Sequence, residues 1–158
     1  DQAHIGTVCT RVQFAANQCP AASVYGEAQA TTPLLDKPLK GLAYLRSSNH
    51  ELPDLVIALK GQVDVVLAGR VDSVNGGIRT TFEATPDAPV SKFTLQMRGG
   101  RKGLLINSAN LCKLKPSQTK ATVLMEGQNG KASDSEPVVK SACKKAKRKK
   151  GHHHKHSR

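Results

Sequence analysis

Aromatic residues are scarce in this 158-residue chain, since Phe and Tyr make up 3% of it and Trp is absent. Proteins that bind single-stranded nucleic acid usually stack bases on exposed aromatic rings, so this composition argues against a folded nucleic-acid reader. Long apolar runs are also missing. No stretch reaches the roughly 18 apolar residues of a membrane-spanning helix, which excludes that class of segment from the sequence.

The sequence also contains few motifs that are typical of catalytic sites. There is no G-x-S-x-G nucleophile elbow, and only His4 and His50 lie outside the C-terminal segment as candidate bases. His50 stands in a polar stretch between expected strands and is predicted to be a solvated loop residue. The Gly99-Gly100-x-x-Gly103 pattern precedes an expected strand rather than a helix, so it predicts a turn and not a phosphate loop.

Four acidic residues near one expected hairpin could supply a glycosidase-type pair of carboxylates: Asp64, Asp72, Glu83 and Asp87. Alternating acids on an antiparallel pair are typical of its solvent face, and Arg70 and Arg79 are available to balance them. The sequence therefore predicts a non-enzymatic protein without a cofactor. A hydrolase with an unrecognised site is the third alternative.

The four Cys residues form two separated pairs, Cys9 with Cys19 and Cys112 with Cys143, without the C-x-x-C spacing of zinc or redox sites. Four Cys allow three disulfide connectivities. Pairing by proximity is favoured and closes loops of roughly 11 and 32 residues, each worth roughly 3 to 4 kcal/mol in the chain-entropy model. The alternative is four reduced, buried Cys in a cytosolic protein, but Cys19 and Cys143 have polar or charged neighbours. Disulfides predict a secreted or cell-surface location.

The sequence begins with Asp1 rather than Met and shows no signal-peptide core, so we expect a mature form or a fragment. Export is thus inferred from cysteine usage alone.

Apolar and polar residues alternate in short runs that are separated by turn residues. These runs cover residues 24–31, 39–46, 55–60, 62–73, 78–85, 92–98, 103–107 and 119–126. About eight short strands at near-regular spacing predict an all-β fold, namely an antiparallel β-sandwich of Ig-like or jelly-roll-like type.

Two hairpins are predicted within this pattern. Asn75-Gly76 suits a type I′ turn, and the residues expected on one face of its two strands are Val63, Val65, Leu67, Ile78, Thr80 and Phe82. A second hairpin is expected at residues 98–101, joining residues 93–97 to residues 104–106.

The domain organisation follows from composition. Residues 1–23 form an irregular lead with a Cys loop, in which residues 12–16 suit a short helix or an edge strand equally well. Residues 24–143 form the sandwich. Residues 144–158 contain no apolar side chain larger than Ala, so they are expected to be a disordered Lys/His-rich tail.

The tail concentrates the positive charge. Eight of the 24 Lys and Arg residues follow Cys143, where no acid is found, so the net charge of +12 falls to about +4 without them. The predicted polyanion-binding residues are Lys144, Lys145, Lys147, Arg148, Lys149 and Lys150. Their partner would be a cell-wall polymer, an anionic lipid or nucleic acid, although the segment could equally serve solubility.

Histidines in the tail form the one candidate metal-binding group: His152, His153, His154 and His156. Neutral imidazoles bind Zn²⁺, Ni²⁺ or Cu²⁺. A flexible chain holds no fixed coordination geometry, and the run is similar to an interrupted purification tag, so adventitious binding is the favoured interpretation.

Several phrases resemble a repeat-bearing family of large, uncharacterised proteins predicted to be secreted by actinobacteria. The phrases are CPAAS at 19–23 with Gly26, TPLL at 32–35, Tyr44-Leu45, LPDL at 52–55, GRVDSVNGGIR at 69–79, PDAPVSKF at 86–93, GLLINS at 103–108 with Leu111-Cys112, and GQNG at 127–130. The resemblance implies a C-terminal unit of a longer exported chain and supplies no reaction, cofactor or catalytic residue. The leading hypothesis is a structural or adhesive module that contacts neighbouring domains or surface polymers; the alternative is a polyanion-binding module that acts through its tail.

Overall fold

A computed structural model describes residues 5–100 and 103–143, and the chain divides into two compact units, residues 1–106 and 107–158. The expected single domain over 24–143 therefore spans a division at residues 106 and 107. The two units are described separately.

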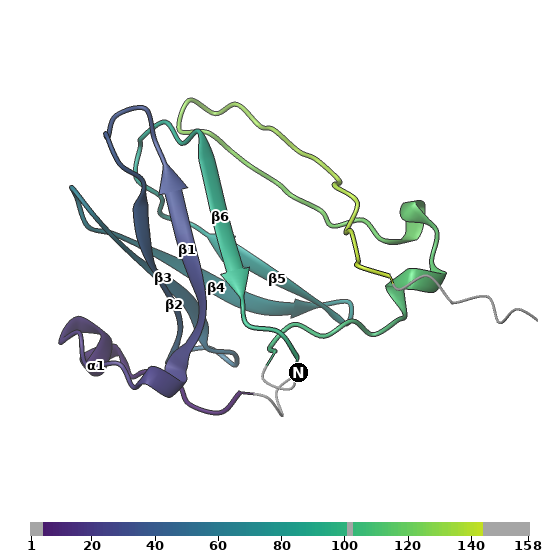
Figure 1. Ribbon diagram of the computed structural model, residues 1–158, viewed down its shortest axis with the longest axis horizontal. Helices are drawn as coiled ribbons and strands as arrows, with labels where there is room; N and C mark the ends of the chain where they lie inside the picture. The colour runs from purple at the N-terminus through teal and green to yellow at the C-terminus, as the bar shows by residue number, and fades with distance from the viewer. Residues whose placement is uncertain (1–4, 101–102, 144–158) are drawn as a thin grey trace, which may run out of the picture. The chain divides into compact units, whose positions relative to one another are not determined.

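The first unit contains one antiparallel sheet of six strands, in the order β5-β4-β3-β2-β1-β6. The sheet curls into a half-barrel (Figure 1). Its strands are β1 Val24–Thr31, β2 Leu39–Arg46, β3 Asp54–Lys60, β4 Val65–Val74, β5 Gly77–Phe82 and β6 Lys92–Met97. Strands β1 to β5 follow one another as a meander, and β6 returns to pair with β1.

Alternation along each strand places apolar side chains on one face of the sheet. The buried core on this inner face consists of Ala28, Ala30, Leu39, Ala43, Leu55, Ile57 and Leu59. Partly buried side chains that pack against this core include Val65, Leu67 and Phe82. The prediction of an all-β, antiparallel fold is confirmed at this level.

The outer face of β3 is also covered, because Val56 is as fully buried as Ile57 on the opposite face. The N-terminal lead lies nearby: the Cys9 N–H donates to the Leu45 carbonyl (2.8 Å), and the Ser47 N–H donates to the Cys9 carbonyl (2.8 Å). The lead contains a short helix, α1 Arg11–Ala15, which is capped by Thr10. The helix alternative for this segment is thus the one observed.

The β4–β5 hairpin confirms the predicted Asn-Gly turn. Asn75 has φ 50° and Gly76 has φ 76°, the positive values that a type I′ turn requires. Val65, Leu67 and Phe82 lie on the inner face as expected. Ile78 also shares the face of Phe82, but it lies beside the turn, beyond the core, and is 55% exposed. The expectation was wrong for Val63, which precedes β4 and is 48% exposed.

The prediction of eight strands in a sandwich is wrong in strand number and layering, because the described residues form one six-stranded sheet. No strand forms over residues 103–107, so the second predicted hairpin is absent. The strand at residues 92–97 pairs with β1 instead of with the segment that follows it. Leu105 and Ile106 remain 64% and 57% exposed. The apolar residues at 104–106 do not alternate with polar ones, so their pattern does not show whether they form a strand or which strand they would pair with.

The second unit contains two 3₁₀ turns, Leu111–Lys113 and Pro116–Gln118, followed by two extended arms that pair antiparallel. Isolated bridges join Lys120 to Val138, Val123 to Ser135 and Glu126 to Ala132. The expected strand at 119–126 is therefore the first arm of a loose hairpin. Its second arm was not predicted, because Ser, Asp, Glu and Pro dominate residues 133–137.

Candidate functional site

Both predicted disulfides are present. Cys9 pairs with Cys19 in the first unit, with 5.2 Å between Cα atoms, and Cys112 pairs with Cys143 in the second unit, with 5.6 Å between Cα atoms. None of the four cysteines is free. The pairing by proximity is confirmed, and each unit is closed by its own covalent link.

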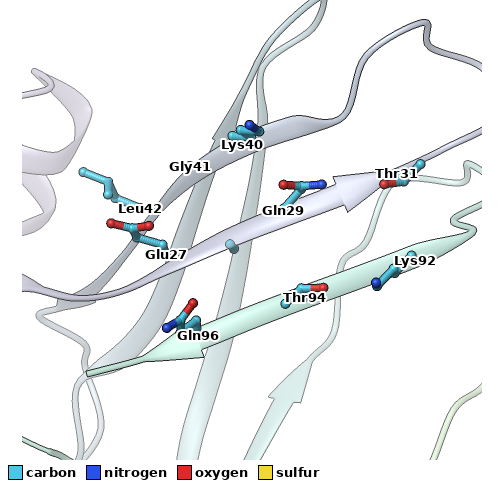
Figure 2. A pocket seen from close by; sticks show the side chains of 10 residues that line it. Glu27, Gln29, Thr31, Lys40, Gly41, Leu42, Lys92, Thr94 and Gln96 are labelled. Carbon is cyan, nitrogen blue, oxygen red and sulfur yellow. The ribbon is translucent and has the colours of Figure 1, made fainter. Parts of the chain in front are cut away.

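An open hollow of about 600 Å³ lies on the outer face of β6, β1 and β2. Figure 2 shows its side chains projecting from three neighbouring strands. The residues that line it are Glu27, Ala28, Gln29, Thr31, Lys40, Gly41, Leu42, Lys92, Thr94 and Gln96. We refer to this surface as the outer hollow.

Strand register arranges the outer hollow in three rows. The first row runs Gln96, Glu27, Leu42, the second runs Thr94, Gln29, Lys40, and the third pairs Lys92 with Thr31. Neighbours within a row are about 4.8 Å apart in backbone spacing, and successive rows are about 6.8 Å apart along the strands. The rows form a regular grid of side chains on three paired strands, and all of these side chains except that of Leu42 are polar.

The polar side chains of this grid have no partner within the described part of the chain. None of the side chains of Glu27, Gln29, Thr31, Lys40, Lys92, Thr94 and Gln96 takes part in a hydrogen bond or ion pair with another described residue. Their donors and acceptors are therefore open to solvent or to a ligand.

Charge is distributed unevenly over the outer hollow. Lys40 lies opposite Lys60 of β3, an arrangement of like charges that is unfavourable between strands. Lys60 is neutralised by Asp64, with 2.8 Å between Nζ and Oδ2, whereas Lys40 and Lys92 have no carboxylate partner among the described residues. The outer hollow thus has two uncompensated ammonium groups in its second and third rows and the Glu27 carboxylate in its first.

A smaller hollow of about 260 Å³ adjoins the outer hollow and shares Lys40, Gly41 and Leu42 with it. Phe14 of α1 and Tyr44 of β2 line it. Their rings meet edge to face with 5.8 Å between centroids, a favourable arrangement for aromatic pairs. Two aromatic side chains therefore line the hollow that adjoins the polar grid on the side of β3.

His50 is not the solvated loop residue that was expected. Its Nε2 lies 2.8 Å from Asp54 Oδ1, and its side chain is 21% exposed. Asp54 also binds Arg46, at 3.1 Å, and the Arg46 guanidinium lies 5.5 Å from the Phe14 ring centroid. Asp54, the first residue of β3, thus joins His50 of the β2–β3 loop to Arg46 of β2. Alternation of apolar and polar residues gives no sign of this ion-pair cluster, because His50 lies in an irregular loop.

A serine near His50 has a structural role. Ser48 Oγ lies within hydrogen-bonding distance of two carbonyl oxygens, those of His50 (3.0 Å) and Leu52 (2.7 Å). Its hydroxyl proton is therefore directed to the loop backbone rather than to the imidazole. The Arg46, His50 and Asp54 cluster holds the loop and the lead together.

Two of the four acids considered as a catalytic pair, Asp64 and Asp72, form surface ion pairs. Asp72 binds Arg70 (3.1 Å) and Arg79 (3.6 Å). The hydrogen bond from Arg70 lowers the pKa of the Asp72 carboxyl, with a further contribution from the charge of Arg79. Glu83 and Asp87 are exposed. The expected balancing of charge by the two arginines is present.

The remaining predicted residues lie outside the described residues: His4, Lys144, Lys145, Lys147, Arg148, Lys149, Lys150, His152, His153, His154 and His156. Within residues 5–100 and 103–143, no group of three or more His, Cys, Asp or Glu side chains gathers. No helix in the same residues is long and apolar enough to cross a bilayer.

No protein family, curated protein or solved structure matches this chain. Sequence reasoning had not identified the outer hollow. The polar positions of residues 27–31 and 92–96 alternate visibly in the sequence, but nothing in that alternation indicated that these two segments pair.

Proposed function

We propose that this chain is an exported, non-catalytic β-module that acts through structural or adhesive contact at a cell surface. The observation that carries the proposal is the disulfide pattern, in which each compact unit is closed by its own bond and no cysteine is left free. Disulfides of this kind persist in oxidising compartments. The resemblance to a secreted repeat family supports the same location.

The open outer hollow supports the adhesive part of the proposal. Seven polar side chains that have no partner among the described residues stand on three strands and provide a contact surface on the sheet. Contacts on a rigid sheet need little ordering of the protein when a ligand binds. A surface polymer or a neighbouring domain of a longer chain would use such a face.

The proposal is tested by producing the full chain in an oxidising and in a reducing compartment. We expect no alkylatable thiol in the first preparation, and retention of that preparation on immobilised neutral or acidic surface polymers. Four reactive thiols in the native protein, or no retention on any polymer, would contradict it. Release of soluble fragments from a polymer would indicate the hydrolase alternative instead.

A second candidate function is polyanion binding through residues 144–158. The observation that favours it is the segregation of charge, with eight of the 24 basic residues and no acid after Cys143. Binding through these charges would depend strongly on salt and little on the chemistry that carries the negative charge. Binding through the tail would therefore not select among polyanions, and this distinguishes it from binding on the outer hollow of the sheet.

A further inference from the structure

We propose that the outer hollow binds an acidic polysaccharide whose carboxylates are separated by neutral, hydroxyl-bearing sugar units. This inference rests on the adhesive function proposed above and identifies its site and ligand class. It begins from the grid of side chains on β6, β1 and β2 (Figure 2).

The neutral side chains in the grid match a hydroxyl-rich ligand. Gln29 and Gln96 each offer an amide donor and an amide acceptor, and Thr31 and Thr94 each offer a hydroxyl that does both. Sugar hydroxyls also donate and accept. Since these side chains have no hydrogen-bond partner among the described residues, binding would break no internal contact.

The two lysines select for negative charge. Lys40 lies opposite Gln29 on β2, and Lys92 lies opposite Thr31 on β6. Neither is paired with a carboxylate in the described chain, so anionic groups of a ligand that crosses β1 would meet an ammonium group at each of these two positions. Charge-assisted hydrogen bonds of this type are about twice as strong as neutral ones.

Glu27 limits how closely the negative charges of the ligand can be spaced. It lies in the row next to Gln29 and Lys40, about 6.8 Å along the strands. Every nucleotide of a nucleic acid strand carries a phosphate, so the next phosphate would fall near this carboxylate. A ligand with a neutral sugar unit at this position could instead donate a hydroxyl to Glu27.

The geometry also distinguishes a polysaccharide from a peptide. A peptide that joins a sheet does so at an open strand edge, through backbone hydrogen bonds. The outer hollow lies on the face of the sheet, where β1 is already paired with β6 on one side and with β2 on the other. Only side chains are available there.

The test uses the full chain and three probes of matched length: hyaluronan, which alternates uronate and neutral sugar, poly-glutamate, and dextran. Dissociation constants are measured across a salt series. We expect at least about 10-fold tighter binding to hyaluronan than to poly-glutamate, because only the sugar polymer can satisfy several amides and hydroxyls at once. Because poly-glutamate carries its charges more densely than hyaluronan, residues 144–158 attract it more strongly, so this ratio is measured in the full-length variant whose Lys and Arg at 144–150 are replaced by Gln.

Two double variants separate the outer hollow from general charge. Lys40→Gln with Lys92→Gln should weaken hyaluronan binding by about 10-fold, whereas Lys113→Gln with Lys131→Gln, two exposed lysines of the second unit, should change it by less than about twofold. Melting midpoints should stay unchanged in both. Gln29→Ala with Thr94→Ala should bring the ratio of hyaluronan to poly-glutamate affinity toward one.

The outcomes distinguish this inference from the proposed function. Equal weakening by the two lysine pairs, or a ratio near one in the variant without the basic run at 144–150, would overturn the outer hollow as the site and leave surface adhesion standing. Tight binding to dextran that does not respond to the lysine variants would do the same. If the wild-type protein binds none of the probes and no other surface polymer, both proposals fail.

Discussion

Replacing Gly76 by Val should destabilise the sheet, because the turn between β4 and β5 needs a positive φ at this residue. Gly76 has φ 76°, and a left-handed conformation costs a side-chain-bearing L-residue about 1 to 2 kcal/mol. A Cβ built at Gly76 meets no atom within 4 Å, so steric crowding adds nothing. We expect a loss of about 2 kcal/mol for the β-branched Val, measured as a lower urea midpoint for the unfolding of the first unit.

Gly77→Val is the matched control for this prediction. Gly77 begins β5 without a positive φ, and a Cβ there approaches only the Val74 carbonyl oxygen at 3.4 Å. The free energy of unfolding should therefore change by less than about 0.5 kcal/mol in this variant. Gly76→Asn should lie between the two, because Asn tolerates the left-handed region. Equal midpoints for the two Val variants would refute the type I′ turn and the strand register that depends on it.

Three further predictions concern other parts of the chain. Gly41→Ala should cost about 3 kcal/mol or more in thermal unfolding, because its Cβ would overlap the Ala58 carbonyl on β3 and force two paired strands apart; an unchanged midpoint would contradict the close approach of β2 and β3. Removing the Cys112–Cys143 disulfide by Cys112→Ser with Cys143→Ser should cost the second unit roughly 4 kcal/mol, seen as faster amide exchange there; equally fast exchange in the sheet would contradict two separately closed units. Replacing the Lys and Arg of residues 144–150 by Gln should flatten a salt slope of roughly −5 for duplex DNA without altering the melting temperature, and a full slope in this variant would place the binding elsewhere.

Local features of the fold were predictable because they are encoded in neighbouring residues. β1 and β2 have the bounds that alternation predicted. The Asn75-Gly76 turn was predictable because few residue types adopt positive φ at both central positions. The Cys9–Cys19 disulfide followed from a short separation in the chain. In each case the chemistry that determines the structure lies within about ten residues.

Features that depend on distant partners were not predictable from the pattern. Alternation shows which side chains share a face of a strand, but not which strand lies beside it. The second predicted hairpin failed for this reason, since residues 92–97 pair with β1 rather than with residues 103–107. The second arm of the hairpin in residues 107–143 was missed because Pro137 and its polar neighbours do not resemble a strand. His50 was misassigned although its partner Asp54 is only four residues away, because the segment between them has no regular structure that would show the two side chains facing each other.

The same limit explains why sequence reasoning proposed binding chemistry in the tail and did not identify the outer hollow. A run of basic residues is visible along the chain, whereas Lys40 and Lys92 are isolated in sequence and come onto one surface only because β6 joins the edge of β1. The two sources of positive charge also differ physically. Consecutive lysines attract any polyanion, but lysines fixed on paired strands beside Gln29 and Thr94 present charge at a set distance from neutral donors and acceptors. If the outer hollow binds as proposed, selectivity between anionic polymers depends on the pairing of β6 with β1, and a variant that disrupts this pairing should lose the preference for a sugar polymer while keeping its attraction to negative charge.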